Sequence, residues 1–129
     1  MGFTRVTIKV ENLKEPGRSA EVECLVDTGA IHTMIPRSVL EQVGIQPERQ
    51  REFTLANGSK ITRSMGAAMV RLNGDQTATD VVFGESGDAA LLGVVTLESM
   101  LLQVDPTSGT LKPLPNYLMS TSPAGTHKI

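Results

Sequence analysis

Residues 25–30 read LVDTGA, and this stretch decides the fold. The segment that leads into it, residues 20–26 (AEVECLV), alternates and then becomes almost continuously apolar, which predicts a strand entering the core. A carboxylate at the end of a buried strand is costly unless it is hydrogen-bonded or functional. Gly29 allows a close turn in which its backbone N–H can hold the Asp27 carboxylate. The stretch therefore predicts a loop built around one functional acid.

Short alternating segments surround this loop on both sides. They predict strands at residues 3–10, 20–26, 32–35, 53–56, 59–63, 67–72, 77–83 and 110–114. Helical spacing of apolar residues predicts two short helices, at residues 37–43 and 96–102. The pair Asn57-Gly58 lies between two strand-like runs and is a strong signal for a hairpin. Many short strands with two short helices indicate a mainly β fold in one domain of 129 residues.

A second motif, Leu91-Leu92-Gly93, lies far downstream of Asp27 and precedes the second predicted helix. With the DTGA loop and the predicted hairpin, it resembles the retropepsin-like aspartic proteases (clan AA, retroviral type). In that family a D-T/S-G-A loop follows an apolar strand, a hairpin flap comes next, and an apolar-apolar-Gly segment leads into a helix. The resemblance covers residues 3–115. It implies the acid protease fold, a closed, β-barrel-like single lobe with one or two short helices that pairs as a two-fold homodimer.

The resemblance also divides the chain into two parts. Residues 1–118 are expected to form the protease domain. Residues 119–129 are expected to be a disordered tail, because residues 120–128 are polar and contain Pro and Gly.

The resemblance implies roles for residues of the loop and the hairpin. Asp27 is the catalytic carboxylate, Thr28 and Gly29 brace it, and the Thr28 hydroxyl reaches the partner subunit. The expected substrate-binding residues are Ala30, Ala56, Asn57, Gly58 and Leu92. The hairpin, from about residue 52 to 62, is the candidate flap, which closes over the peptide and excludes water. The peptide binds in extended form and adds main-chain hydrogen bonds like an extra strand.

The chemistry implied by the resemblance needs two carboxylates. Two acids about 3 Å apart share one proton, and their pKa values belong to the pair. None of the other aspartates, Asp75, Asp80, Asp88 and Asp105, lies in a D-T/S-G context, and Asp105 opens DPTSG, which predicts a turn. The second acid is therefore expected from a second copy, and 129 residues are too few for two such lobes. No cofactor or metal is needed, and activity is expected at acidic to mildly acidic pH.

Two positions depart from the retroviral pattern. Retroviral members commonly have an acidic residue two places after the DTG glycine, which pairs with an Arg directly after the later glycine. Here these positions are Ile31 and Val94, both apolar. No orphan charge remains, and such a replacement can be neutral for stability. The chain therefore resembles the cellular bacterial and archaeal single-domain members more than the viral ones.

Composition excludes several partner classes. A formal net charge of -2 leaves no electrostatic footprint for nucleic acid, and four aromatic residues are too few for a base-stacking platform. No run of 18 apolar residues is present, so no membrane span is predicted. The single cysteine, Cys24, and the lack of a signal-peptide pattern favour a cytoplasmic protein. The expected partners are a second copy of the chain and a peptide or protein substrate.

Plainer interpretations accompany each motif. His32 has only one other histidine in the chain, so it is interpreted as a partly exposed strand residue rather than a ligand. Cys24 is interpreted as a plain strand thiol. Glu85 and Asp88 could suggest a metal pair, but a Gly-rich acidic loop is usually solvated. The alternative functions are a catalytically weak or inactive binding and dimerisation module with the same fold, and a monomeric β-barrel with a chance DTG.

Overall fold

The computed structural model describes residues 4–115. In chain order the elements are β1 (Arg5–Glu11), β2 (Ser19–Val26), β3 (Thr33–Pro36), α1 (Arg37–Gln42), β4 (Arg49–Thr54), β5 (Lys60–Leu72), β6 (Asp75–Gly84), β7 (Leu91–Leu92), α2 (Val94–Ser99), β8 (Leu102–Val104) and β9 (Leu111–Pro113). The predicted mainly β fold with two short helices is confirmed. The predicted tail, residues 119–129, lies outside the described residues.

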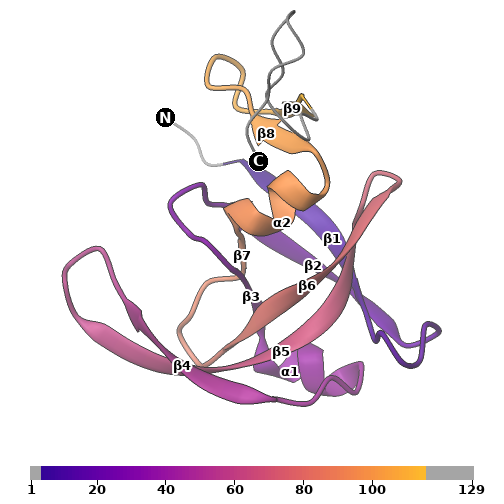
Figure 1. Cartoon of the computed structure of the whole chain (residues 1–129), viewed down its shortest axis with the longest axis vertical. Coiled ribbons are helices and arrows are strands. Elements are labelled where there is room, and N and C mark those ends of the chain that lie inside the picture. The colour runs from indigo at the N-terminus through magenta and orange to yellow at the C-terminus, as the bar shows by residue number, and fades with distance from the viewer. Residues whose placement is uncertain (1–3, 116–129) are drawn as a thin grey trace, which may run out of the picture.

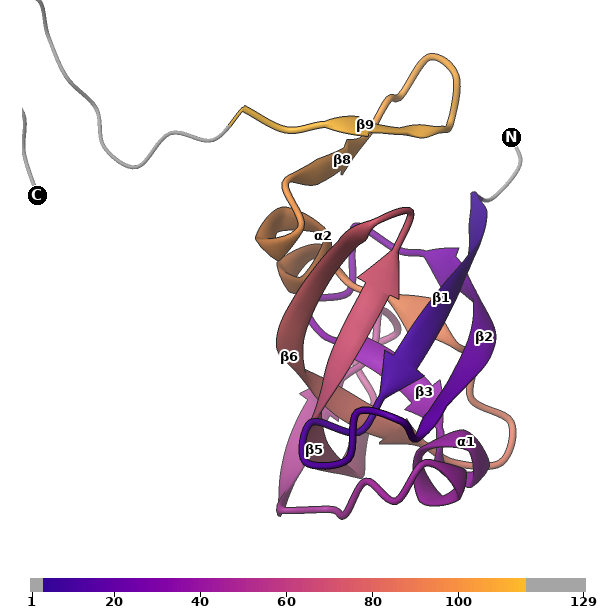
Figure 2. The same ribbon diagram turned by 90° about the vertical axis from the view of Figure 1, so that its right-hand side faces the viewer.

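Seven of the strands form one sheet that closes on itself. Their order is β1-β2-β7-β3-β6-β5-β4, and β1 also pairs with β5, so six strands make a ring that β4 extends. Figures 1 and 2 show this ring from two directions, with α1 and α2 toward opposite ends of it. The predicted barrel-like single lobe is therefore confirmed.

The interior of the ring holds the hydrophobic core. Alternation along β1 and β2 turns Ile8, Val10, Val22 and Cys24 inward and leaves the side chains between them exposed or half-exposed. The other buried members of this core are Ile35, Leu40, Val43, Ile45, Ala68, Val70, Leu72, Val81, Phe83, Leu92, Leu97 and Met100. Both helices, β3 and β7 thus contribute to the core against which the Asp27 loop is built.

The hairpin strands are longer than the sequence predicts. Separate strands were expected at residues 59–63 and 67–72, but β5 runs unbroken and pairs first with β4 and then with β6. Gly66 lies within this strand next to another segment, because a Cβ there would lie 2.7 Å from the carbonyl oxygen of Gln46. Close passage of a neighbouring segment, rather than a strand end, is the reason for this glycine.

The second helix is displaced from its predicted range of 96–102. It begins at Val94 and ends at Ser99, because Leu101 adopts a φ of 58° in the left-handed region. Leu102 then begins β8, a strand that the sequence analysis missed, which pairs with β9 as a separate two-stranded sheet. The predicted strand at 110–114 is confirmed as the shorter β9.

The DPTSG segment is a turn, as predicted. The side chain of Asp105 accepts a hydrogen bond from the backbone N–H of Thr107 at 2.8 Å, and its carbonyl accepts one from Gly109 at 2.8 Å. The Thr107 N–H lowers the pKa of the Asp105 carboxyl. The hydrogen bonds of Asp105 therefore stabilise the turn in which it lies.

Candidate active site

Asp27 lies where β2 leaves the ring, and β7 anchors it there. Leu25 and Val26 pair in parallel with Leu91 and Leu92. The backbone N–H of Asp27 then donates to the carbonyl oxygen of Leu92 at 3.0 Å. This bond continues the pairing by one residue and fixes the start of the loop, so the carboxylate extends from a held backbone.

The DTGA loop holds its own carboxylate. The N–H of Gly29 donates to Oδ1 of Asp27 at 2.9 Å, as the sequence predicts. The N–H of Ala30 donates to the carbonyl of Asp27 at 3.1 Å and closes the turn. A Cβ at position 29 would lie 3.2 Å from the same Oδ1, so glycine keeps that contact free. Asp27 and Ala30 are half-buried, whereas Thr28 and Gly29 are exposed, so the loop faces outward.

The Leu91-Leu92-Gly93 segment packs beneath this loop. A Cβ at Gly93 would lie 2.5 Å from both the carbonyl carbon and oxygen of His32. No side chain fits at that distance, so the glycine is required for the two segments to touch. The Leu92 side chain is fully buried in the core, and only its backbone reaches Asp27. The predicted substrate-binding residue Leu92 is thus placed under the loop, with its side chain away from any surface.

Two threonines bind the layers under the loop together. Thr33 Oγ1 accepts a hydrogen bond from the N–H of Gly93 at 3.0 Å and lies 2.6 Å from Oγ1 of Thr96. Both threonines are fully buried. The contact joins β3, the glycine and α2 at one point. No local pattern in the sequence indicates this pair, because its members are 63 positions apart.

The two positions that depart from the retroviral pattern, Ile31 and Val94, lie on segments that backbone hydrogen bonds join. The N–H of Val94 donates to the carbonyl of Ala30 at 2.8 Å, and the N–H of Val95 donates to that of Ile31 at 3.1 Å. The side chain of Ile31 is 62% exposed and that of Val95 is 40% exposed. The loop and the start of α2 therefore present an apolar surface next to Asp27.

The β4–β5 hairpin projects from the body of the ring, as Figure 1 shows. At its tip, Oδ1 of Asn57 accepts hydrogen bonds from the N–H and hydroxyl of Ser59, at 2.9 and 2.6 Å. Gly58 has a φ of 86°, which a turn glycine adopts easily. Ala56, Asn57 and Gly58 are all exposed.

The hairpin approaches the Asp27 loop through two rings, near the tip end of β4, where Phe53 pairs with Ile61. The ring of His32 lies edge-on to that of Phe53, with centroids 6.2 Å apart and planes at 79°. Such a T-shaped arrangement is favourable for aromatic pairs. His32, interpreted from sequence as a partly exposed strand residue, is half-buried as that interpretation expects, but it lies just before β3 and links the loop to β4.

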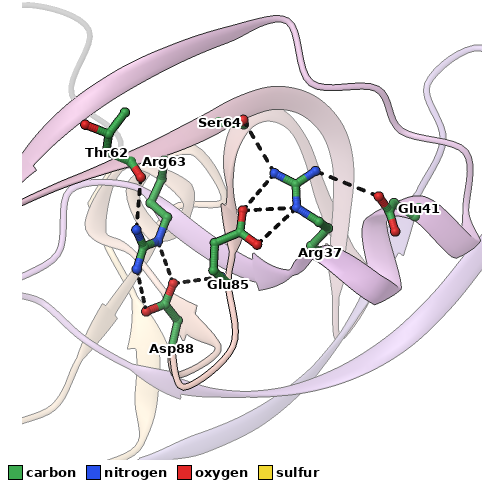
Figure 3. Close-up of polar contacts among 7 residues, drawn as sticks. All are labelled: Arg37, Glu41, Thr62, Arg63, Ser64, Glu85 and Asp88. Atoms are coloured by element: carbon green, nitrogen blue, oxygen red, sulfur yellow. Dashed lines mark hydrogen bonds and ion pairs between the residues drawn. The ribbon is translucent and has the colours of Figure 1, made fainter.

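The acidic loop after β6 is not simply solvated, and that interpretation was wrong. Arg37 binds Glu85 through Nε and Nη2, the shortest distance being 2.7 Å. Arg63 binds Asp88 through Nε at 2.7 Å and Nη2 at 3.0 Å. Figure 3 shows the two arginines reaching the loop from different elements. These hydrogen bonds lower the pKa of both carboxyls, so each stays ionised as the pH falls.

The comparison with protein families places these features in a known class. The family described as gag-polyprotein putative aspartyl protease matches residues 17–99. The chain belongs to this family. The matched segment of the aspartyl protease family runs from just before β2 to the end of α2, so it includes the Asp27 loop, the hairpin and β7. None of the curated proteins compared matches the chain.

Three further observations bear on other kinds of site. Among residues 4–115, no three His, Cys, Asp or Glu side chains gather in a way that could hold a metal ion. None of the helices in the same range is long and apolar enough to cross a membrane. Cys24 is buried, and desolvation raises the pKa of its thiol to about 12.

Proposed function

We propose that this member of the aspartyl protease family is an endopeptidase that works as a homodimer, with Asp27 from each copy forming the catalytic dyad. The observation that carries the proposal is the loop itself. Asp27 is held by the N–H of Gly29 on an outward-facing turn whose backbone is anchored to β7. The family match covers this loop and the segment that anchors it.

In the proposed mechanism the two carboxylates share one proton. The ionised Asp27 takes a proton from a water molecule, and the oxygen of that water attacks the peptide carbonyl. The protonated Asp27 of the partner subunit donates its proton toward the carbonyl oxygen. The N–H of Gly29 keeps each carboxylate in place, and exposed Thr28 is free to reach the partner. Because one acid must stay protonated, activity is expected to be highest at acidic to mildly acidic pH.

The apolar surface beside Asp27 supports the proposed dimer. A second copy related by a two-fold axis would cover this patch, which includes Ile31 and Val95, with the same patch of the partner, since such an interface is self-complementary. Removing these exposed side chains from water gives a gross gain of roughly 25 cal/mol per Å² of apolar area, against which the entropy cost of association counts. In retroviral relatives a charged pair occupies this region, and its absence here supports the proposal that the chain is of the cellular type.

The hairpin and Ala30 complete the proposed substrate site. In this proposal Ala30 leaves room beside the acid, and the tip residues Ala56, Asn57 and Gly58 lie over an extended peptide. The His32–Phe53 contact supports this role, because it places the tip end of β4 next to the loop that carries Asp27. Closure of the tip would exclude water from the dyad.

The second candidate is a module that dimerises and binds peptides without hydrolysing them. The apolar pair Ile31 and Val94 favours it, since the charged pair of active retroviral relatives is missing. Dimerisation without cleavage at any pH would distinguish this candidate from the first.

The test is cleavage of a diverse mixture of unstructured peptides, read by mass spectrometry from about pH 3 to 7. Wild type, Asp27→Asn and Asp75→Asn are compared at high protein concentration. Asp75 is an exposed residue at the start of β6 and serves as the matched control. Cleavage by wild type and Asp75→Asn alone supports the protease. Equal cleavage by Asp27→Asn contradicts it, and a dimer with no cleavage by any variant supports the binding module.

A further inference from the structure

The loop between β6 and β7 is held by arginines from two sides. Arg37, at the start of α1, binds Glu85, and Arg63, on β5, binds Asp88. Asp88 Oδ2 also accepts the backbone N–H of Glu85 at 2.7 Å, so the two carboxylates are fixed relative to each other. Figure 3 shows both guanidinium groups turned toward this loop. The loop is therefore tied at once to the helix and to the hairpin.

The Arg63–Asp88 pair differs from the surface ion pairs of this protein. Its side chains are only 18% and 16% exposed, against 60% and 63% for Arg5 and Glu23. Arg63 makes two hydrogen bonds to the carboxylate, and Nη1 donates to the carbonyl of Thr62 at 2.9 Å. A bidentate, shielded pair is stronger and more geometrically specific than an exposed one. This pair can therefore hold two segments in a defined relation.

Asp88 also offsets the repulsion between two arginines that face each other within the hairpin. Arg63 on β5 lies directly opposite Arg51 on β4. Like charges directly opposite each other destabilise an antiparallel pair. The carboxylate of Asp88 neutralises one of them from outside the hairpin. Without it, the part of the hairpin that leads to the tip would carry an uncompensated repulsion.

A short path of contacts leads from Asp88 to the acid. The residues that follow it lead into β7, and just before that strand the carbonyl of Ala90 accepts the N–H of Leu25 at 2.9 Å. The carbonyl of Leu92 accepts the N–H of Asp27 at 3.0 Å. The same short segment thus binds the hairpin at one end and the Asp27 loop at the other.

We propose that Arg63 and Asp88 are positioning residues that latch the β4–β5 hairpin to the segment anchoring Asp27. The latch fixes the base of the hairpin, so that only the tip moves when a peptide binds. The expected change in KM rests on the proposed protease function. The expected change in hairpin mobility does not. Loss of the latch frees the hairpin, raises the ordering cost of closing it over a substrate and increases KM more than it lowers kcat.

Hydrogen exchange tests the latch without relying on activity. Amide exchange in residues 49–63 is compared by mass spectrometry among wild type, Asp88→Asn, Arg63→Lys and Glu23→Gln. Arg63→Lys keeps the charge but loses the bidentate geometry, and Glu23→Gln removes an exposed pair between β1 and β2. We expect exchange about tenfold faster in the hairpin of both latch variants and wild-type rates in Glu23→Gln. Wild-type hairpin exchange in both latch variants would overturn the proposal.

Kinetics separate this inference from the proposed function. On a peptide that the wild type cleaves, the latch predicts a KM about tenfold higher in Asp88→Asn, with kcat changed less than about threefold. A loss confined to kcat would contradict the positioning role. If the wild type cleaves no peptide, the protease proposal fails. The hydrogen-exchange result still shows whether Arg63 and Asp88 hold the hairpin.

Discussion

The hydroxyl groups of Thr33 and Thr96 lie 2.6 Å apart in the buried layer beneath the Asp27 loop. Thr33 also accepts the N–H of Gly93, so one side chain joins β3, the segment after β7 and α2. Buried polar groups that satisfy one another in this way fix a single arrangement, because any other arrangement leaves one of them without a partner. The threonine pair therefore supports the loop from below, in addition to the bond from Asp27 to Leu92.

Replacement of Thr33 by Val tests that support. The variant keeps the shape but leaves the Gly93 N–H and the Thr96 hydroxyl unpaired, which is expected to lower the free energy of unfolding by about 1–3 kcal/mol. Thr7→Val, on the exposed side of β1, is the control and should change it by less than about 0.5 kcal/mol. Urea unfolding gives both values. Equal stability of the two variants would show that the buried pair contributes nothing.

Gly93→Ala should be among the most damaging small substitutions in the chain. The added methyl group would lie 2.5 Å from the His32 backbone, so the segment just before β3 and the start of α2 must move apart. A loss of about 3 kcal/mol or more is expected from this overpacking. Gly17→Ala is the matched control, because nothing lies within 4 Å of its added methyl group. Thermal unfolding should separate the two, and comparable melting temperatures would rule out the close contact.

Cys24 should be chemically inert in the folded protein. Its burial raises the pKa of the thiol to about 12, so almost no thiolate forms at pH 8. Labelling with a thiol reagent at pH 8 should be slow in native protein and fast in urea. Rapid stoichiometric labelling of the native chain would contradict the burial of this strand residue.

The Arg63–Asp88 pair should make stability depend on pH in a defined direction. The hydrogen bond from Arg63 holds the pKa of the Asp88 carboxyl below its usual range, whereas in the unfolded chain it is about 4. The stabilisation is therefore fully present above pH of about 5 and is lost as the pH falls through the folded-state pKa. The stability difference between wild type and Asp88→Asn should be largest near pH 7 and shrink below about pH 4. A stability difference that grows as the pH falls would contradict the lowered pKa of Asp88 in the folded protein.

The sequence predicts the features that depend on local chemistry. Asp27 at the end of an apolar strand and the turn at Gly29 could be read from neighbouring residues, and both are where the prediction puts them. The end of α2 could not be predicted in this way, because leucine is not a residue type that indicates the left-handed conformation seen at Leu101. The backbone of Leu101 is held by hydrogen bonds to the carbonyl of Glu98 and from the N–H of Leu114, and a pattern of single residues does not record such contacts.

Contacts between distant segments were equally beyond the sequence. Arg63 and Asp88 are 25 positions apart, and an acidic, Gly-rich loop has the composition of a solvated one. Only the closed ring of strands brings the loop against β5. The sequence does not predict the Thr33–Thr96 pair or the His32–Phe53 contact for the same reason. The contacts that support the site therefore depend on the strand topology and not on a sequence motif.

Subunit mixing tests the central claim, a site shared by two copies of Asp27, most directly. Wild type and Asp27→Asn are combined in equal amounts, allowed to exchange subunits at a concentration that favours dimers, and assayed at constant total protein. Random pairing leaves about one quarter of the dimers with two intact carboxylates, so the account predicts about a quarter of the wild-type rate. A rate of about one half would mean that each chain works alone and would contradict the shared dyad.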